Sequence, residues 1–272
     1  MKQIIVATDF TAASRNALEW VCQLVPGGAS ILLRHIFTMP VSYTSEGLAL
    51  ASLHDALDIA EQELEGELGW LMQQYPAVKA DGRIVTGTGF SATLQEAIAQ
   101  DKPDLVVMPA AADYAELWTW DQDMLTALTD TNVPILLVPR HTTWQGLHHI
   151  GFACDYRYAG TAQQAAFLSW LTATAKAKLH VVHVTRAMPA HPDEINRNTA
   201  HLHQLLEGLQ PQYHSIEDPN VIEAVTQFVK DEHIDFMIVI PHKHDVWYSL
   251  FHQSHTRQLA RLNHIPVLAL HD

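Results

Sequence analysis

The chain has 272 residues, of which 48% are hydrophobic and 17% are charged, and this composition excludes a disordered or low-complexity protein. The 30 acidic residues outnumber the 16 basic ones, and the net charge of −14 disfavours nucleic acid and anionic membranes as partners. No apolar run approaches the roughly 18 residues that span a bilayer, and the N-terminus enters a short apolar strand without a cleavable leader. We therefore expect a cytoplasmic protein that contacts neither nucleic acid nor membrane.

Short apolar runs alternate with longer segments of helical period through the first half of the chain. Leu64, Leu68 and Leu71, for example, are spaced three or four residues apart, as on one face of a helix. The predicted strands are residues 4–7, 31–36, 84–86, 105–108 and 135–138, and the predicted helices are 14–24, 48–75, 92–100 and 122–130.

The second half repeats this order. Residues 4–10 return as 150–156, and each segment is an apolar run that ends in Asp and an aromatic residue. Residues 32–36, 104–109 and 132–138 likewise match 180–184, 235–241 and 264–270, and helices are predicted at 161–175, 193–209, 219–232 and 255–263, with Asp218 before Pro219 as the start signal of the third. We therefore predict two copies of one domain, residues 1–141 and 147–272, joined between Pro139 and His148.

Continuous apolar strands separated by helices are typical of a parallel sheet that is covered on both faces. Five such units in each copy predict an α/β fold with two tandem, doubly wound, five-stranded parallel-sheet domains. Ligands of such sheets bind outside the carboxyl ends of the strands, where the strand order reverses. The loops after the first and fourth strands are therefore the places to look for function.

The repeated segments 6–10 and 152–156, together with Pro134 and Pro266 before the last strands, resemble the universal stress protein family in its tandem two-domain form. The resemblance covers nearly the whole chain and implies the adenine-nucleotide alpha-hydrolase-like fold and a role in stress response. It also implies that the two copies pack as a pseudo-dimer within the chain, and that chains pair as homodimers. In nucleotide-binding members the first-strand Asp approaches the adenosine, and a glycine-rich loop after the fourth strand holds the phosphates. The positions that match this Asp are Asp9 and Asp155.

The phosphate-loop positions have lost their glycines in both copies. In the second copy only Ser254 matches the family pattern, and prolines replace the first glycine in each. Proline removes a backbone donor, and Cβ atoms push a phosphate away from the remaining amides. The degenerate positions are Pro109, Ala112, Asp121 and Gln122 in the first copy, and Pro241, His244 and Gln253 in the second. We predict that neither copy binds ATP in the family manner, so that no cofactor is expected and Asp9 and Asp155 either order a turn or cap a helix, with ligand contact as the alternative.

Histidine is the one unusual residue type, with 18 in the chain and most of them in the second copy. Four lie around the degenerate second loop and form a candidate transition-metal site: His242, His244, His252 and His255. The alternative is that they are polar residues that fill the space of a nucleotide. His35 and His183 occupy matching strand positions, where we expect buried neutral imidazoles bonded to the backbone.

The sequence contains none of the common hydrolase or phosphate-loop motifs, so we do not expect an enzyme. The two cysteines, Cys22 and Cys154, are expected to be small buried residues. The predicted function is a non-catalytic binding or scaffold protein with an unknown protein partner. The alternatives are an adenine-nucleotide sensor with an atypical site and a metal- or pH-responsive histidine-rich module.

Overall fold

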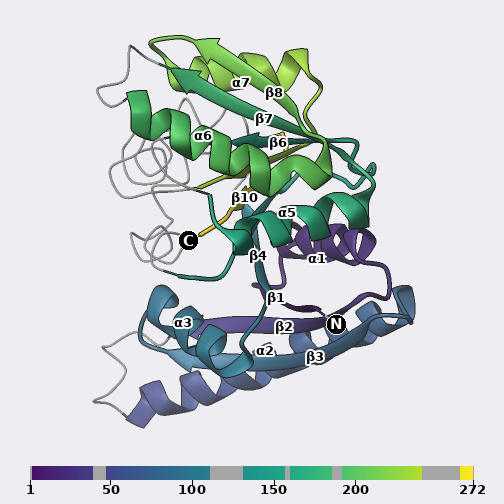
Figure 1. The fold of residues 1–272 in the computed structure, drawn as a ribbon. Helices are drawn as coiled ribbons and strands as arrows, with labels where there is room; N and C mark the ends of the chain where they lie inside the picture. The colour runs from purple at the N-terminus through teal and green to yellow at the C-terminus, as the bar shows by residue number, and fades with distance from the viewer. Residues whose placement is uncertain are drawn as a thin grey trace. The chain divides into compact units, whose positions relative to one another are not determined.

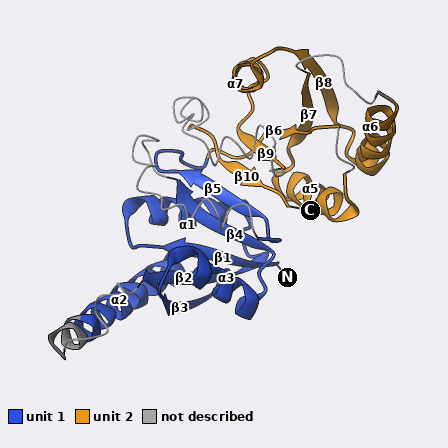
Figure 2. Ribbon diagram, turned by 90° about the vertical axis from the view of Figure 1, so that its left-hand side faces the viewer, with its two compact units in different colours: residues 1–144 blue, residues 145–272 orange. Residues whose placement is uncertain are grey.

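The computed structural model describes residues 2–38, 47–110, 131–156, 160–185, 192–240 and 264–271. The chain divides into two compact units, residues 1–144 and 145–272, which Figure 2 shows in blue and orange. Each unit consists of parallel strands and the helices that connect them (Figure 1).

Unit 1 contains five parallel strands in the order β3-β2-β1-β4-β5. The chain runs outward from β1 to β2 and β3 and then returns to β4 on the other side of β1. The strand order therefore reverses beside β1. The elements are β1 (Lys2–Thr8), α1 (Ala12–Leu24), β2 (Ala29–Thr38), α2 (Gly47–Gln74), β3 (Lys79–Gly87), α3 (Phe90–Asp101), β4 (Leu105–Ala110) and β5 (Ile135–Pro139).

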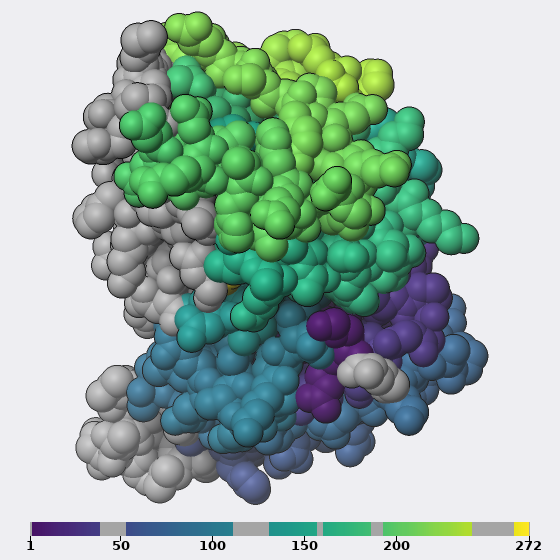
Figure 3. Space-filling view, in the orientation of Figure 1, coloured from purple at the N-terminus to yellow at the C-terminus, as the bar shows by residue number. Residues whose placement is uncertain are grey.

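Unit 2 has the same topology, with the strand order β10-β9-β6-β7-β8 and β6 in the place of β1. In the space-filling view, α6 lies at the surface of this unit, in agreement with its largely exposed side chains (Figure 3). The elements are β6 (His149–Ala153), α5 (Ala162–Ala175), β7 (Lys178–Thr185), α6 (Pro192–Leu206), η3 (Glu207–Leu209), β8 (Gln212–Glu217), α7 (Val221–Asp231), β9 (Phe236–Val239) and β10 (Val267–Ala269).

The central strands are buried on both faces. Ile4, Ile5 and Val6 follow one another in β1 and are all fully buried, although successive side chains of a strand point to opposite faces. Both faces of the sheet must therefore be covered, and this explains why the strands read as unbroken apolar runs. The predicted fold class, two five-stranded parallel-sheet domains, is confirmed.

The start of α7 differs from the prediction. Asn220, and not Asp218, caps the helix, because its side chain accepts a hydrogen bond from the backbone N–H of Glu223 at 3.3 Å. Asp218 instead accepts from the N–H of Asn220 at 2.7 Å and orders the preceding turn. The helix predicted over 193–209 also ends earlier, at Leu206, and continues as the short η3.

The predicted helices 122–130 and 255–263 lie outside the described residues. Among the helices that the structure does describe, none is long and apolar enough to cross a bilayer.

Candidate functional site

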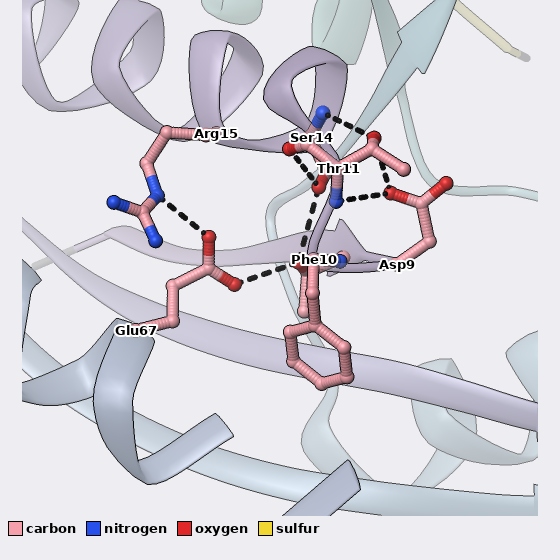
Figure 4. A network of polar contacts seen from close by, with 7 residues as sticks. Asp9, Phe10, Thr11, Ser14, Arg15 and Glu67 are labelled. Carbon is pink, nitrogen blue, oxygen red and sulfur yellow. Dashed lines mark hydrogen bonds and ion pairs between the residues drawn. The ribbon is translucent and has the colours of Figure 1, made fainter. Parts of the chain in front are cut away.

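The candidate site of unit 1 lies at the carboxyl end of β1, where the strand order reverses. Figure 4 shows a network of polar contacts at this edge, formed by the β1–α1 turn, the first turn of α1 and one side chain of α2.

Asp9 orders the turn between β1 and α1. Its Oδ1 atom accepts two hydrogen bonds from Thr11, from the backbone N–H at 3.1 Å and from the hydroxyl at 2.6 Å. Thr11 is the N-cap of α1, and its Oγ1 accepts from the N–H of Ser14 at 3.3 Å. Partial burial acts to raise the pKa of the Asp9 carboxyl, but the hydrogen bonds from Thr11 and Ser14 outweigh it and lower the pKa from 3.8.

Phe10 holds the turn in an uncommon backbone conformation. Its φ is 62°, a left-handed value that costs a non-glycine residue about 1 kcal/mol or more. Two contacts compensate for this strain: the N–H of Phe10 donates to the Thr8 hydroxyl at 3.0 Å, and the ring stacks on His35 with centroids 4.5 Å apart. The Nδ1 atom of His35 lies 2.8 Å from the carbonyl oxygen of Thr8, which can only accept, so Nδ1 carries the proton.

A buried carboxylate from α2 completes the network. The Glu67 side chain is only 2% exposed, and it accepts from the Thr8 hydroxyl at 2.7 Å and from Arg15 Nε at 2.9 Å. Arg15 also lies over the ring of Trp70, 4.2 Å from its centroid. The Ser14 hydroxyl donates to the carbonyl of Thr11, and Thr8 and Ser14 are both buried.

Glu67 is not among the site residues predicted from the sequence, although a signal for it is present. Glu67 lies three residues after Leu64 and four before Leu71, which places a carboxylate on the apolar face of the helix. Acidic residues are almost never fully buried without a partner, so this position predicts a buried cation or donor beside it.

Unit 2 repeats the aromatic part of this arrangement. Tyr156 follows β6 as Phe10 follows β1, and its ring lies 4.4 Å from that of His183. The Nδ1 atom of His183 lies 3.1 Å from the carbonyl oxygen of Cys154. The prediction that His35 and His183 bond to the backbone is confirmed, although both rings are half-buried rather than buried.

A thiol takes the place of the Thr8 hydroxyl in unit 2. Cys154 is buried, and burial raises the pKa of its thiol to about 12, so it stays protonated and unreactive at neutral pH. Burial also raises the pKa of Cys22 to about 12, and both cysteines are free, as expected for small buried residues.

The structure locates three of the site residues predicted from the sequence. Asp9 is exposed at the end of β1, Asp155 is half-buried after β6 in the other unit, and Pro109 lies within β4, where it pairs with Val138 of β5. The remaining candidates lie outside the described residues: Ala112, Asp121, Gln122, Pro241, His244, Gln253 and Ser254 of the loops, and His242, His252 and His255, which with His244 form the predicted metal set.

Comparisons with known proteins agree with this fold. The family model described as "Universal stress protein family" matches residues 1–114. Among proteins with curated descriptions, none matches the sequence.

Several solved structures share the fold over nearly the whole chain. A universal stress protein from Archaeoglobus fulgidus superposes with a TM-score of 0.64 at 14% identity, covering 99% of this chain and 96% of that one. A putative universal stress protein from Pseudomonas aeruginosa gives 0.60 at 13% identity, covering 100% and 93%. The cytoplasmic domain of a prokaryotic cation chloride cotransporter gives 0.55 at 11% identity, covering 98% and 94%. At these identities the likeness establishes the fold alone.

Proposed function

We propose that this chain is a stress-response protein of the universal stress type that acts by binding, without catalysis, and that neither unit binds ATP in the family manner. The match of residues 1–114 to the family model and the shared fold support the general role. The proposal includes a cytoplasmic location and a protein partner, either a second copy of the chain or another protein.

The observation that carries the loss of ATP binding is Pro109 in β4. Pro109 takes the place of the first phosphate-loop glycine, pairs with Val138 of β5, and has no backbone N–H to donate to a phosphate. The polar network at the end of β1 does not compensate for this loss, because Arg15 is already engaged by Glu67 and Trp70. Asp9 matches the aspartate that approaches the adenosine in nucleotide-binding members, so its carboxylate does not by itself exclude ATP.

The same contacts argue against catalysis at this edge. The Thr8 hydroxyl lies 2.7 Å from Glu67, a distance at which a carboxylate could activate a nucleophile. Thr8 is only 6% exposed and Ser14 is fully buried, so a substrate cannot reach either hydroxyl. The pair therefore acts as a structural contact.

One observation favours an adenine-nucleotide sensor as the second candidate. Asp9 is exposed, and both hydrogen bonds from Thr11 use the same carboxylate oxygen, so the other oxygen, Oδ2, points away from the contacts drawn in Figure 4. This oxygen could accept hydrogen bonds from ribose hydroxyls without disturbing the turn.

Calorimetric titration of the full chain with ATP and Mg²⁺, beside ADP and AMP, separates the two candidates. Our proposal expects no saturable heat at millimolar nucleotide. Saturation below roughly 100 µM would overturn it. If that binding is lost in Asp9→Asn and kept in Asp55→Asn, an exposed aspartate of α2, the sensor role is supported.

A further inference from the structure

We propose that unit 2 contains a binding site for a divalent transition metal ion such as Zn²⁺, formed by His180, His214 and Glu232. This inference does not depend on the proposed function, and it uses none of the histidines of the second loop.

The topology brings the two histidines to one face of the sheet. His180 of β7 pairs in register with Gln212 of β8, so His214, two residues further along β8, points to the same side. The rings of His180 and His214 are stacked, with centroids 5.3 Å apart. Figure 1 shows α7 beside these two strands, and Glu232 is the residue that ends α7. The three side chains thus come from three different elements.

The distances suit a metal ion. One ligand atom from each residue can be chosen so that all three lie within 4.8 Å of one another. Nδ1 of His180 lies 3.2 Å from Nε2 of His214 and 3.7 Å from Oε2 of Glu232. Metal–ligand bonds of 2.0–2.1 Å in a tetrahedral site place neighbouring ligand atoms about 3.3 Å apart. The two histidine nitrogens, which share a hydrogen bond that a bound ion would replace, already have this spacing. The carboxylate of Glu232 must move closer to complete the site.

The ligand set and its exposure fit an open metal site. Two histidines and one glutamate are a known set for zinc sites that keep a fourth position for water. His180 is 2% exposed, His214 is 22% exposed and Glu232 is 37% exposed. The site is therefore closed on the side of the sheet and open to solvent on the side of Glu232, which gives an ion a path of entry.

His149 of β6 supplies the support that a ligating histidine requires. Its Nδ1 lies 2.9 Å from Nε2 of His180. If Nδ1 of His180 binds the ion, Nε2 must carry the proton and donate it to His149, which fixes the orientation of the His180 ring. His149 is thus a positioning residue.

Phe228 of α7 packs against the rings of both histidines. Its ring centroid lies 5.0 Å from that of His214 and 6.4 Å from that of His180. The cluster therefore combines a buried histidine, a half-buried histidine, a supporting hydrogen bond to His149 and an exposed acidic ligand.

The test is metal titration of the full chain, prepared without a histidine tag and stripped with a chelator. Zn²⁺ binding is followed by calorimetry, and Co²⁺ reports the coordination geometry through its visible absorption. We expect about one tightly bound ion per chain. His214→Gln and Glu232→Gln are expected to weaken binding at least about tenfold and to change the Co²⁺ spectrum. His54→Gln, which alters a histidine that is 77% exposed in unit 1, is the matched control and is expected to bind as the parent does.

His149 is tested separately by two variants. His149→Asn keeps an acceptor for Nε2 of His180 and is expected to retain the Co²⁺ spectrum, whereas His149→Leu removes the acceptor and is expected to lower the affinity and alter the spectrum. Circular dichroism checks that each variant is folded. The absence of stoichiometric binding by the folded parent would overturn the proposal, and so would binding that His214→Gln and Glu232→Gln both leave unchanged, because the ion would then lie elsewhere.

Discussion

The hydroxyl of Thr8 donates a hydrogen bond to the carboxylate of Glu67, 2.7 Å away and 59 positions later in the chain. This contact joins the end of β1 to the middle of α2, and Arg15 of α1 binds the other carboxylate oxygen. Three elements of unit 1, β1, α1 and α2, are therefore tied together at one buried acidic group.

Replacing this carboxylate is expected to destabilise unit 1. Glu67→Ala leaves the buried Thr8 hydroxyl without its acceptor and Arg15 without its ion pair, and we expect a loss of about 2 kcal/mol in the free energy of unfolding. Arg15 is 36% exposed and can regain water, which keeps the loss below that of a fully buried pair. Urea denaturation measures the change. Glu65→Ala, on the exposed face of the same helix, is expected to change stability by less than about 0.5 kcal/mol, and an equal loss in both variants would contradict the interpretation.

The cap of α1 gives a second prediction. Thr11→Ala removes the oxygen that accepts from Ser14 and the hydroxyl that donates to Asp9, with an expected cost of about 1 kcal/mol. Thr11→Ser keeps both bonds and is expected to retain most of the stability. If the two variants unfold at the same urea concentration, the hydroxyl has no capping role.

The lowered pKa of Asp9 predicts how stability depends on pH. A carboxyl group whose pKa is lower in the folded state than in the unfolded state stabilises the fold above the unfolded value. This stabilisation is lost as the pH falls through the folded value, which lies below 3.8. The difference in unfolding free energy between the parent and Asp9→Asn is therefore expected to be constant near neutral pH and to shrink below about pH 4. Urea denaturation at a series of pH values checks this, and a difference that grows in acid would show that the sign is wrong.

Two lysines that end helices are expected to limit stability. Lys102 ends α3 with a φ of 46°, and Lys176 ends α5 with a φ of 55°. Glycine adopts this left-handed conformation without the cost that a Cβ atom imposes, so Lys102→Gly and Lys176→Gly are each expected to stabilise the protein by up to about 1 kcal/mol. Lys79→Gly, in strand β3, is the control and is expected to destabilise it. Thermal unfolding distinguishes the three variants, and a loss of stability at both helix ends would refute the prediction.

The side chains packed against β6 leave little room for a Cβ atom at Gly151. A Cβ atom at Gly151 would lie 2.8 Å from Met237 Sδ and 3.0 Å from Ile234 Cγ2. Gly151→Ala is expected to cost about 1–3 kcal/mol, because these packed side chains must move. Gly208→Ala meets nothing within 4 Å and is expected to be tolerated. Comparable melting temperatures for the two variants would mean that the packing adapts freely.

Local patterns predicted most of the fold, because a parallel sheet buries both faces of its strands. The unbroken run of Ile4, Ile5 and Val6 carries this signal, and the repeat at 150–156 extends it to the second unit. The sequence predicts Asp218 as the cap of α7 because Pro219 follows it, but Asn220 in the same turn is an equally good cap and is the one the helix uses. Sequence alone did not decide between them.

The candidate sites depend on contacts between distant residues, and these were harder to predict. The place of Glu67 on the apolar face of its helix predicts a buried partner, but that partner, Thr8, lies in another element and cannot be identified from the local sequence. His180, His214 and Glu232 are separated along the chain, and only the register of β7 and β8 brings the two rings together. The histidines near residue 250 form a recognisable pattern because they are close in sequence. His180, His214 and Glu232 form no such local pattern.

The paired rings Phe10–His35 and Tyr156–His183 have a consequence for interpreting related sequences. In each unit the imidazole bonds to the carbonyl of the residue before the aspartate, and the aromatic ring of the residue after it lies against the imidazole. Contacts within the unit thus hold the backbone on both sides of the aspartate. Because an aspartate at this position takes part in a turn, its presence in a related sequence is not by itself evidence of nucleotide binding.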